Sequence, residues 1–245
     1  MPFENKEGQN VPDVTFMIRR NNQLLPVTTD EIFKGKTVVA FSLPGAYTPT
    51  CSSSHVPHYE QLTETFKQNG VDDVVCFSVN DGFVMEAWQK ELDAPSVTFI
   101  ADGNGDFTKG MGLLVDKSDI GFGPRSWRYS MLVRDKKIVK MFIEPEKPGD
   151  PFEVSDARTM LNYINPKAEL PHFVTVFARE GCPHCIAAKA LLKERGIKFE
   201  VINTGAGSGL TARTLEAVCG RSTVPQIFIG SKHIGGREDL EKYFA

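Results

Sequence analysis

The sequence has no apolar run that approaches the ~20 residues a membrane-spanning helix requires. Its amino terminus, MPFENKEGQN, has neither an apolar core nor the cleavage pattern of a secretory leader. The basic residues are scattered and the formal net charge is only −3, which argues against binding to nucleic acid. We therefore expect a cytoplasmic protein that binds neither membranes nor nucleic acid.

Cysteine is scarce, with five among 245 residues. An odd number at irregular spacing, without a leader, argues against a disulfide framework and favours reactive thiols or a metal site. Zinc normally takes four ligands in paired groups. Beside the one C-x-x-C pair, the remaining candidates show no second C-x-x-C and no H-x-x-x-H spacing: Cys219, His172, His184 and His233. A G-x-G-x-x-G turn after a strand is also missing. We expect no bound metal and no bound cofactor.

The composition, 41% hydrophobic and 24% charged, is that of a globular protein able to bury a core. A chain of this length suits one large domain or two small ones. The stretch NPKAELPH combines two prolines with polar residues, as linkers do. We predict a first domain at residues 1–164, a linker at 165–171 and a second domain at 172–245.

Both halves alternate continuous apolar strands with helices, which indicates α/β domains whose sheets are covered on both faces. In the first half the pattern predicts strands at 37–44, 74–81 and 96–102, two strands within 128–144, and helices at 55–70, 81–92 and 155–164, the last starting at Ser155. In the second half it predicts strands at 173–178, 198–203, 226–230 and 232–235 and helices at 183–195, 211–220 and 237–244.

Two cysteines stand close together in REGCPHC, residues 179–185. Cys182 falls between a strand and a helix, and Pro183 occupies the first helical position, where no N–H is needed. The positive end of a helix lowers the pKa of such a thiol from ~8.5 to as little as ~3.5–7. Cys185 lies one turn further on the same face, within reach of a disulfide to Cys182. The pair predicts a redox site rather than zinc or core packing.

The second domain resembles glutaredoxin, a thioredoxin-fold family, through CPHC, then STVPQIFIG, then HIGGREDL. The resemblance covers residues 172–245 and implies a cis peptide before a proline that is held beside the reactive sulfur. His184 stands where many relatives have tyrosine, which bears on the thiol pKa and the redox potential. The residues that the resemblance implies for binding glutathione are Arg179, Thr223, Val224, Pro225, Gly236, Arg237, Glu238 and Asp239.

Another cysteine, Cys51, stands alone at the end of PGAYTPTC. It also lies where a strand gives way to a helix, so the helix start favours its thiolate. Thr48 places a hydroxyl three residues before the sulfur, and Pro44 stiffens the loop.

Pro-x-x-x-Thr-x-x-Cys is the active-site signature of the peroxiredoxins, and residues 1–164 resemble their type-five subfamily through PGAYTPTCSSSHVP, VVCFSVND and WRYSMLV. The resemblance implies peroxide chemistry: the thiolate attacks one peroxide oxygen in line while the other leaves as hydroxide or alkoxide, so donors must hold both oxygens. The Thr48 hydroxyl and the Cys51 N–H can do so from one side. The same resemblance implies a catalytic arginine at the start of a later strand, which selects Arg128, with Arg125 as the alternative. It also implies dimers or larger homo-oligomers. The catalytic residues predicted for the whole chain are Pro44, Thr48, Cys51, Arg128, Cys182 and Cys185.

Three other side chains have simpler expectations. Cys76 sits mid-strand among apolar residues, so we expect a buried, inert thiol. Cys219 ends a helix just before Gly220, and we expect a partly buried bystander. His55 lies one turn past Cys51, where lining the pocket, capping and packing all remain open.

Peroxide converts a reactive thiolate to sulfenic acid, which must be reduced before further oxidation makes the damage irreversible. In some type-five relatives a resolving cysteine follows the hairpin, but the corresponding stretch here, EPEKPGDPFEVSDA, has none. An outside thiol is therefore needed. We expect glutathione to condense with oxidised Cys51, and Cys182 then to remove it.

The sequence thus predicts two thioredoxin-fold domains, an N-terminal peroxiredoxin domain and a smaller C-terminal glutaredoxin domain. The expected activity is a glutathione-dependent peroxidase acting on hydrogen peroxide and alkyl hydroperoxides. A separate glutathione reductase would supply electrons from NADPH. Two alternatives are a peroxide sensor that relays oxidation to client proteins and a general protein-disulfide reductase that does not use Cys51.

Overall fold

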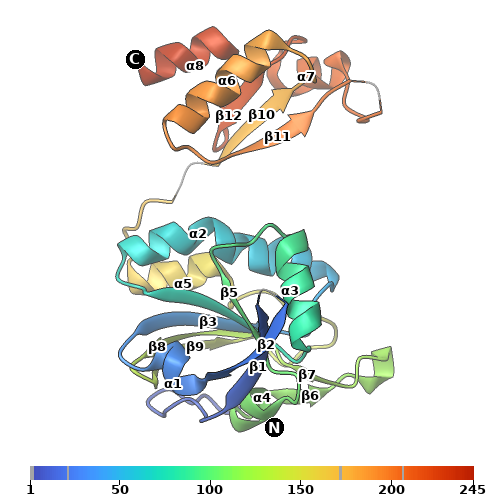
Figure 1. The fold of residues 1–245 in the computed structure, drawn as a ribbon. Coiled ribbons are helices and arrows are strands. Elements are labelled where there is room, and N and C mark those ends of the chain that lie inside the picture. The colour runs from blue at the N-terminus through green and yellow to red at the C-terminus, as the bar shows by residue number, and fades with distance from the viewer. Residues whose placement is uncertain (1–2, 21, 171–172, 206) are drawn as a thin grey trace. The chain divides into compact units, whose positions relative to one another are not determined.

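The chain folds into two compact units, residues 1–170 and 171–245, in a computed structural model (Figure 1). The structure describes residues 3–20, 22–170, 173–205 and 207–245. Residues 171 and 172, which include the end of the predicted linker and the start of the predicted second domain, lie outside the described residues. Each unit is described by itself.

The first unit is built on a five-stranded sheet with the order β5-β4-β3-β8-β9. Strands β3, β4 and β5 run parallel, while β8 pairs antiparallel with β3 and with β9. The strand bounds are β3 Thr37–Leu43, β4 Asp73–Ser78, β5 Thr98–Ala101, β8 Tyr129–Arg134 and β9 Lys137–Ile143. These confirm the predicted strands, including the pair within 128–144.

Helices cover both faces of this sheet, as its continuous apolar strands require. Helices α2 (Val56–Gln68) and α5 (Ala157–Ile164) lie on one face, and the short α1 (Thr29–Phe33) and α4 (Asp106–Gly110) lie on the other. Helix α3 (Gly82–Glu91) packs against the β5 edge of the sheet. Two apolar cores result, one on each face of the sheet.

Several short elements were not predicted. They are the hairpin of β1 (Thr15–Arg20) and β2 (Gln23–Thr28) and the pair of β6 (Leu114–Asp116) and β7 (Pro124–Ser126), together with α1 and α4. In β2 the apolar side chains are largely exposed and a proline interrupts the strand, so neither periodicity nor propensity marks it.

The predicted helix at 155–164 begins later than expected. Its N-cap is Asp156, whose carboxylate accepts hydrogen bonds from the N–H groups of Arg158 and Thr159. Ser155 cannot cap the helix because its hydroxyl and its N–H both donate to the buried carboxylate of Glu144. The expected serine start was therefore wrong by one residue, for a reason that lies in tertiary contacts.

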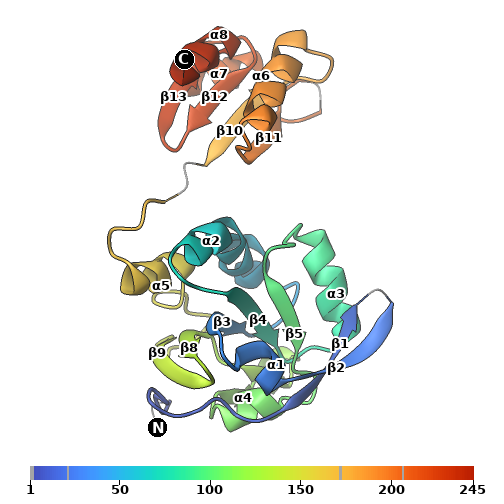
Figure 2. The same cartoon turned by 60° about the vertical axis from the view of Figure 1, so that its left-hand side comes forward.

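The second unit has a four-stranded sheet with the order β11-β10-β12-β13. Strand β10 pairs parallel with β11 and antiparallel with β12, and β12 pairs antiparallel with β13. The elements confirm the predicted βαβαββα order: β10 Val174–Ala178, α6 Pro183–Glu194, β11 Phe199–Asn203, α7 Ala212–Cys219, β12 Gln226–Ile229, β13 Lys232–Gly235 and α8 Arg237–Phe244. Figure 2 shows α6 and α8 beside this sheet.

Candidate active site

Cys51 lies at the start of the helix that follows β3. Residues 49 and 50 are helical, the turn Cys51–His55 is a π-helix, and α2 continues from Val56. The first four N–H groups of a helix have no partner inside it, so the sulfur lies in the region where a helix favours negative charge. Its exposed fraction is 0%, so the thiol is enclosed in this conformation.

The loop between β3 and this helix is held by polar contacts. Pro44 is buried, and the N–H of Ala46 donates to the Asn80 side chain at 3.0 Å. The Thr48 hydroxyl donates to the carbonyl of Gly45 at 2.9 Å. With its proton committed there, the hydroxyl oxygen is left to accept a hydrogen bond rather than to donate one. This differs from the donor role expected of it from the sequence.

Arg128 is the cation beside Cys51. It immediately precedes β8, its exposed fraction is 1%, and its Nη1 lies 3.0 Å from Nδ1 of His55. Burial works against its charge, but the Cys51 sulfur and the Asp150 carboxylate outweigh burial and raise the pKa of Arg128. Its Nε has no acceptor among the described residues. Arg125, the alternative, donates instead to the carbonyl of Val79.

His55 is fully buried beneath this site. Its ring contacts Phe41, with 4.8 Å between ring centroids, and Nε2 lies 3.2 Å from the carbonyl of Ser155. Burial first, and then the positive charge of Arg128, lower the pKa of His55 well below its ordinary value. The histidine is thus a neutral hydrogen-bond partner of the arginine, a role that was not among those considered from the sequence, which were pocket lining, capping and packing.

The remaining cysteine of the first unit is embedded in the sheet. Cys76 lies within β4 with an exposed fraction of 0%. Burial, and then the proximity of Cys51, raise the pKa of the Cys76 thiol well above its ordinary value. A protonated, enclosed thiol is a poor nucleophile, so Cys76 matches the inert residue expected.

A second thiol site lies at the start of α6. Cys182 is the N-cap of this helix, and its sulfur accepts a hydrogen bond from the N–H of Cys185 at 3.2 Å. The two sulfurs are 2.6 Å apart, and both cysteines are free thiols. Burial, and then the hydrogen bond to Cys182, raise the pKa of the Cys185 thiol to about 11. Cys185 is therefore the proton-bearing member of the pair, and the N-cap position places the Cys182 sulfur where it can act as the nucleophile.

A groove of about 550 Å³ opens beside Cys182. Among the residues expected to bind glutathione, Arg179, Thr223 and Val224 line it. The peptide bond between Val224 and Pro225 is cis, and the Val224 carbonyl lies 3.8 Å from the Cys182 sulfur. The groove falls within the size range of small-ligand pockets, about 300–1,000 Å³.

Pro225 precedes β12, and the last four residues expected to bind glutathione, Gly236, Arg237, Glu238 and Asp239, lie at the start of α8. Asp239 accepts from the N–H of Gly236 at 2.9 Å and pairs with Arg221 at 2.7 Å, while Arg237 pairs with Glu241 at 2.7 Å. They do not line the groove, although Gly236 lies near the Pro225 carbonyl. Glu238 is exposed in the first turn of the helix. These side chains cap and brace the helix in this conformation.

Cys219 is the last residue of α7 and is partly exposed. Its thiol lies 3.1 Å from the Leu215 carbonyl, within its own helix. Gly220 ends the helix in the left-handed region with φ 70°. This position matches the bystander expected.

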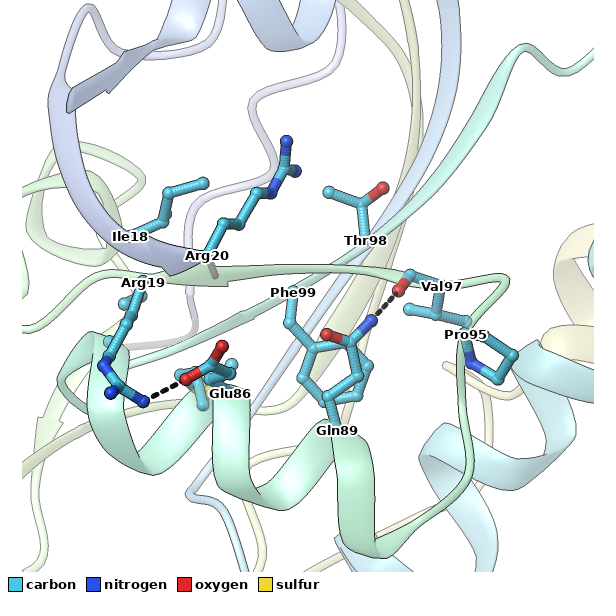
Figure 3. Close-up of a pocket in the computed structure, with 12 residues that line it drawn as sticks. Ile18, Arg19, Arg20, Glu86, Gln89, Pro95, Val97, Thr98 and Phe99 are labelled. Atoms are coloured by element: carbon cyan, nitrogen blue, oxygen red, sulfur yellow. Dashed lines mark hydrogen bonds and ion pairs between the residues drawn. The ribbon is translucent and has the colours of Figure 1, made fainter. Parts of the chain in front are cut away.

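Another hollow, of about 240 Å³, lies between β1, α3 and β5 (Figure 3). Two polar contacts are made within it: Arg19 pairs with Glu86, and the Gln89 amide donates to the Val97 carbonyl at 2.9 Å. Within the described part of the chain, its lining includes none of the residues singled out from the sequence. We assign it no part in the chemistry.

Two further searches of the described residues gave negative results. No group of three or more histidine, cysteine, aspartate or glutamate side chains is arranged to hold a metal ion. None of the described helices is long and apolar enough to cross a membrane.

The sequence analysis gave the segment that packs on His55 and Arg128 no part in the site. Asp150 and Ser155 come from the stretch after β9, which carries no motif. The one available signal is Glu144, a carboxylate placed directly after a strand of apolar character. An acidic residue that is buried there needs donors close by.

The first site is an enclosed cysteine beside an arginine, and the second is a pair of thiols at a helix start. Together they define a thiol-dependent oxidoreductase. Residues 6–161 match the Redoxin family and residues 174–234 match Glutaredoxin. The chain is 56% identical over 239 residues to the hybrid peroxiredoxin hyPrx5 of Haemophilus influenzae, and the match covers 98% of each protein. The chain belongs to the peroxiredoxins and carries a glutaredoxin domain at its C-terminal end.

Solved structures agree on the first domain. Reduced Prx3 of Vibrio vulnificus in complex with H2O2 is 38% identical, covers 66% of this chain and 99% of its own, and gives a TM-score of 0.62. Peroxiredoxin 5 of Alvinella pompejana is 32% identical, covers 67% of this chain and 100% of its own, and gives 0.58. These likenesses confirm the predicted thioredoxin-like fold. Family and domain content together support thiol peroxidase activity.

Proposed function

We propose that this protein reduces hydrogen peroxide and alkyl hydroperoxides with electrons from glutathione, and that Cys51, Cys182 and glutathione act in turn. The observation that carries the proposal is the buried pair of Cys51 and Arg128 on the same chain as the Cys182 thiol pair. The first site is suited to meeting a peroxide. The second is suited to exchanging disulfides.

In the first step the Cys51 thiolate attacks one peroxide oxygen, the O–O bond breaks, and sulfur is oxidised to sulfenic acid. Water or an alcohol leaves once the departing oxygen gains a proton. Arg128 supports this step because its unpartnered Nε–H and its charge favour the negative oxygen that develops. Thr48 orients the hydroperoxide by accepting its O–H.

In the second step a glutathione thiol condenses with the sulfenic acid, which forms a mixed disulfide and releases water. Cys51 is enclosed, so this step requires the helix start to open before a tripeptide thiol can reach the sulfur. The only other cysteine before residue 182 is Cys76, which is buried and protonated. Because Cys76 cannot readily attack the sulfenic acid, a thiol from outside this domain, here that of glutathione, is the resolving partner we propose.

In the third step the Cys182 thiolate attacks the glutathione sulfur of the mixed disulfide, and Cys51 leaves as a thiolate. The glutathionylated Cys182 is then released by a second glutathione, which yields glutathione disulfide, or by Cys185, which yields an internal disulfide. The groove beside Cys182 has room for the tripeptide, and Arg179 offers its carboxylate a cation. Attachment to one chain raises the local concentration of the reductant, to the millimolar range for short flexible linkers.

Repeated turnover consumes glutathione, so we propose that a separate glutathione reductase regenerates it with electrons from NADPH. We further propose that the protein is cytoplasmic, forms a homo-oligomer and binds no cofactor. The alternative is a peroxide sensor, for which the same residues would serve.

A coupled assay separates the two. The full chain is mixed with peroxide, glutathione, glutathione reductase and NADPH, and NADPH oxidation is followed. Consumption of many equivalents per chain supports the peroxidase, whereas one or two equivalents support the sensor. A general disulfide reductase predicts activity that a Cys51→Ser variant retains in full.

A further inference from the structure

Glu144 is a buried carboxylate whose partners are peptide groups. It follows β9 directly and has an exposed fraction of 1%. Its oxygens accept hydrogen bonds from three consecutive N–H groups, those of Glu153 at 2.8 Å, Val154 at 2.9 Å and Ser155 at 2.8 Å. The Ser155 hydroxyl adds a fourth at 2.7 Å. Hydrogen bonds to an ionised acceptor are roughly twice as strong as neutral ones, so this carboxylate fixes the backbone at 153–155.

The backbone that Glu144 fixes belongs to a segment, residues 150–155, that contacts both side chains behind Cys51. The Asp150 carboxylate pairs with Nη2 of Arg128. The Phe152 ring centroid is 5.4 Å from the guanidinium carbon and 4.9 Å from the His55 ring centroid. The Ser155 carbonyl lies 3.2 Å from Nε2 of His55. One segment thus supplies a charge, a ring and a carbonyl to these two residues.

Arg128 and the Ser155 carbonyl together determine which nitrogen of His55 carries the proton. Arg128 can only donate, so Nδ1 of His55 must be the bare, accepting nitrogen. The proton therefore sits on Nε2 and is donated to the Ser155 carbonyl. The Tyr59 hydroxyl donates to the same carbonyl at 2.9 Å. A shift of this carbonyl would disturb the acceptor on which the Arg128 guanidinium depends.

We infer that Glu144 is a positioning residue for the peroxide-reactive centre. By clamping residues 153–155 it sets the Ser155 carbonyl and fixes one end of the segment that carries Asp150, and these two groups orient His55 and Arg128 toward Cys51. Glu144 does not touch the sulfur and acts only through these residues. The inference rests on the proposed role of Cys51, and it adds a buried residue outside the sequence motif to that site.

A merely structural role is the alternative, and the same domain contains a matched case. Asp102 has an exposed fraction of 2% and accepts from the N–H groups of Phe107 at 3.1 Å and Thr108 at 2.8 Å and from the Thr108 hydroxyl at 2.7 Å. It fixes the start of α4, on the face of the sheet opposite α2. Glu144 and Asp102 therefore anchor the backbone in similar ways, but of the two only Glu144 binds a segment that contacts Arg128.

The experiment compares three full-chain variants with the parent protein. Glu144→Gln replaces one accepting oxygen with an NH2 that faces N–H donors. Ser155→Ala removes only the hydroxyl bond to Glu144 and keeps the clamp on the backbone, which provides a milder variant that folds if Glu144→Gln does not. Asp102→Asn is the matched control. Each is measured by thermal unfolding, by the rate of Cys51 oxidation in a single turnover with hydrogen peroxide, and by the pH profile of Cys51 alkylation.

We expect Glu144→Gln to slow Cys51 oxidation by about tenfold or more, the scale on which a displaced catalytic group lowers a rate. Its alkylation profile should move to higher pH, because the cation is no longer held on the sulfur. Ser155→Ala should show a smaller change, about twofold to threefold, in the same direction. Asp102→Asn should lower the unfolding temperature as much as Glu144→Gln while leaving both Cys51 readouts within about twofold.

The inference is overturned if Glu144→Gln, or Ser155→Ala where the former does not fold, leaves the oxidation rate and the alkylation profile at parent values. It is also overturned if Asp102→Asn changes both as strongly. The pH profile of Cys51 alkylation is measured without peroxide, so it tests the role of Glu144 whether or not Cys51 reduces peroxides. A failure of the proposed function would instead appear in the parent protein, as a Cys51 that does not react with peroxide.

Discussion

Nη1 of Arg128 and Nδ1 of His55 lie 3.0 Å apart, and the histidine is the accepting partner. Both side chains are almost wholly enclosed, with exposed fractions of 1% and 0%. A buried cation is costly unless it is paired and hydrogen-bonded. Here the negative charge that balances Arg128 comes from Asp150 and the Cys51 sulfur, while the neutral His55 imidazole accepts a hydrogen bond from the guanidinium. The guanidinium is thereby held beside the sulfur without a second cation opposing it.

Replacement of Arg128 tests this arrangement. Arg128→Lys keeps a positive charge but loses the planar fork that serves His55, Asp150 and the sulfur together. The rate constant for Cys51 oxidation by peroxide should fall by about a hundredfold, the usual scale for loss of one such donor. Rapid-mixing measurements of single-turnover oxidation check this. Arg125→Lys serves as the comparison, and an equal loss in that variant would assign the role to Arg125.

The neutral state of His55 predicts a pH dependence of stability. Its pKa is lowered in the folded protein, so below the ordinary value of 6.5 the unfolded chain takes up a proton that the folded chain refuses. Stability is therefore retained above that pH and falls as the pH drops through 6.5 toward the native pKa, by at most about 1.4 kcal/mol per pH unit. Urea unfolding of the parent and of His55→Gln at about pH 7.5, 6.5 and 5.5 measures the difference.

The control for that series is His58→Gln, which removes an exposed histidine from the same helix. Its stability should follow the parent's pH dependence, whereas His55→Gln should lose part of the slope. Identical slopes in the parent and His55→Gln would show that His55 takes up its proton equally in both states.

Cys182→Ser should separate oxidation from turnover. Removal of this sulfur leaves the first site intact, so one equivalent of peroxide should still oxidise Cys51. Glutathione-supported turnover should stop, because no thiolate is left to remove glutathione from Cys51. The coupled NADPH assay measures turnover and peptide mass spectrometry measures the single oxidation. Cys219→Ser is the matched control, and unimpaired turnover in Cys182→Ser would contradict the sequence of steps proposed.

Cys185→Ser tests how Cys182 is released. The pKa of Cys185, about 11, leaves its thiol almost wholly protonated at neutral pH, so a second glutathione is the competing route. The Cys185→Ser variant should keep a substantial part of glutathione-dependent turnover, and in the parent Cys182 should be alkylated well before Cys185. Complete loss of turnover in Cys185→Ser would require the route through an internal disulfide.

The sequence revealed the parts of each site that are local in the chain. Cys182, Pro183 and Cys185 sit in one helical turn, and helix-start chemistry follows directly from their order. The contacts that complete the first site are not local. His55 and Ser155 are 100 positions apart, and the sheet and its connections bring them together. No periodicity or motif encodes that meeting, because it depends on how a whole domain packs.

The hydrophobic pattern of the sequence predicted the burial of Cys76 but could not predict that of Glu144. The strand around Cys76 is continuously apolar, so its enclosed position followed from the sequence. Glu144 is enclosed to the same degree, yet a carboxylate at a strand end is ordinarily exposed. Its burial depends on three N–H groups that face it from residues 153–155, and only the folded chain provides them.

The central claim is that Cys51 is the sulfur that meets peroxide and then glutathione. The most direct measurement adds one equivalent of hydrogen peroxide to the full-length Cys182→Ser variant, then glutathione, and maps each product by peptide mass spectrometry. The account predicts one added oxygen on Cys51, followed by one glutathione on the same residue, and neither product when Cys51→Ser is added to that background. An unmodified Cys51 thiol after peroxide has been consumed, with oxidation found on another cysteine instead, would contradict it.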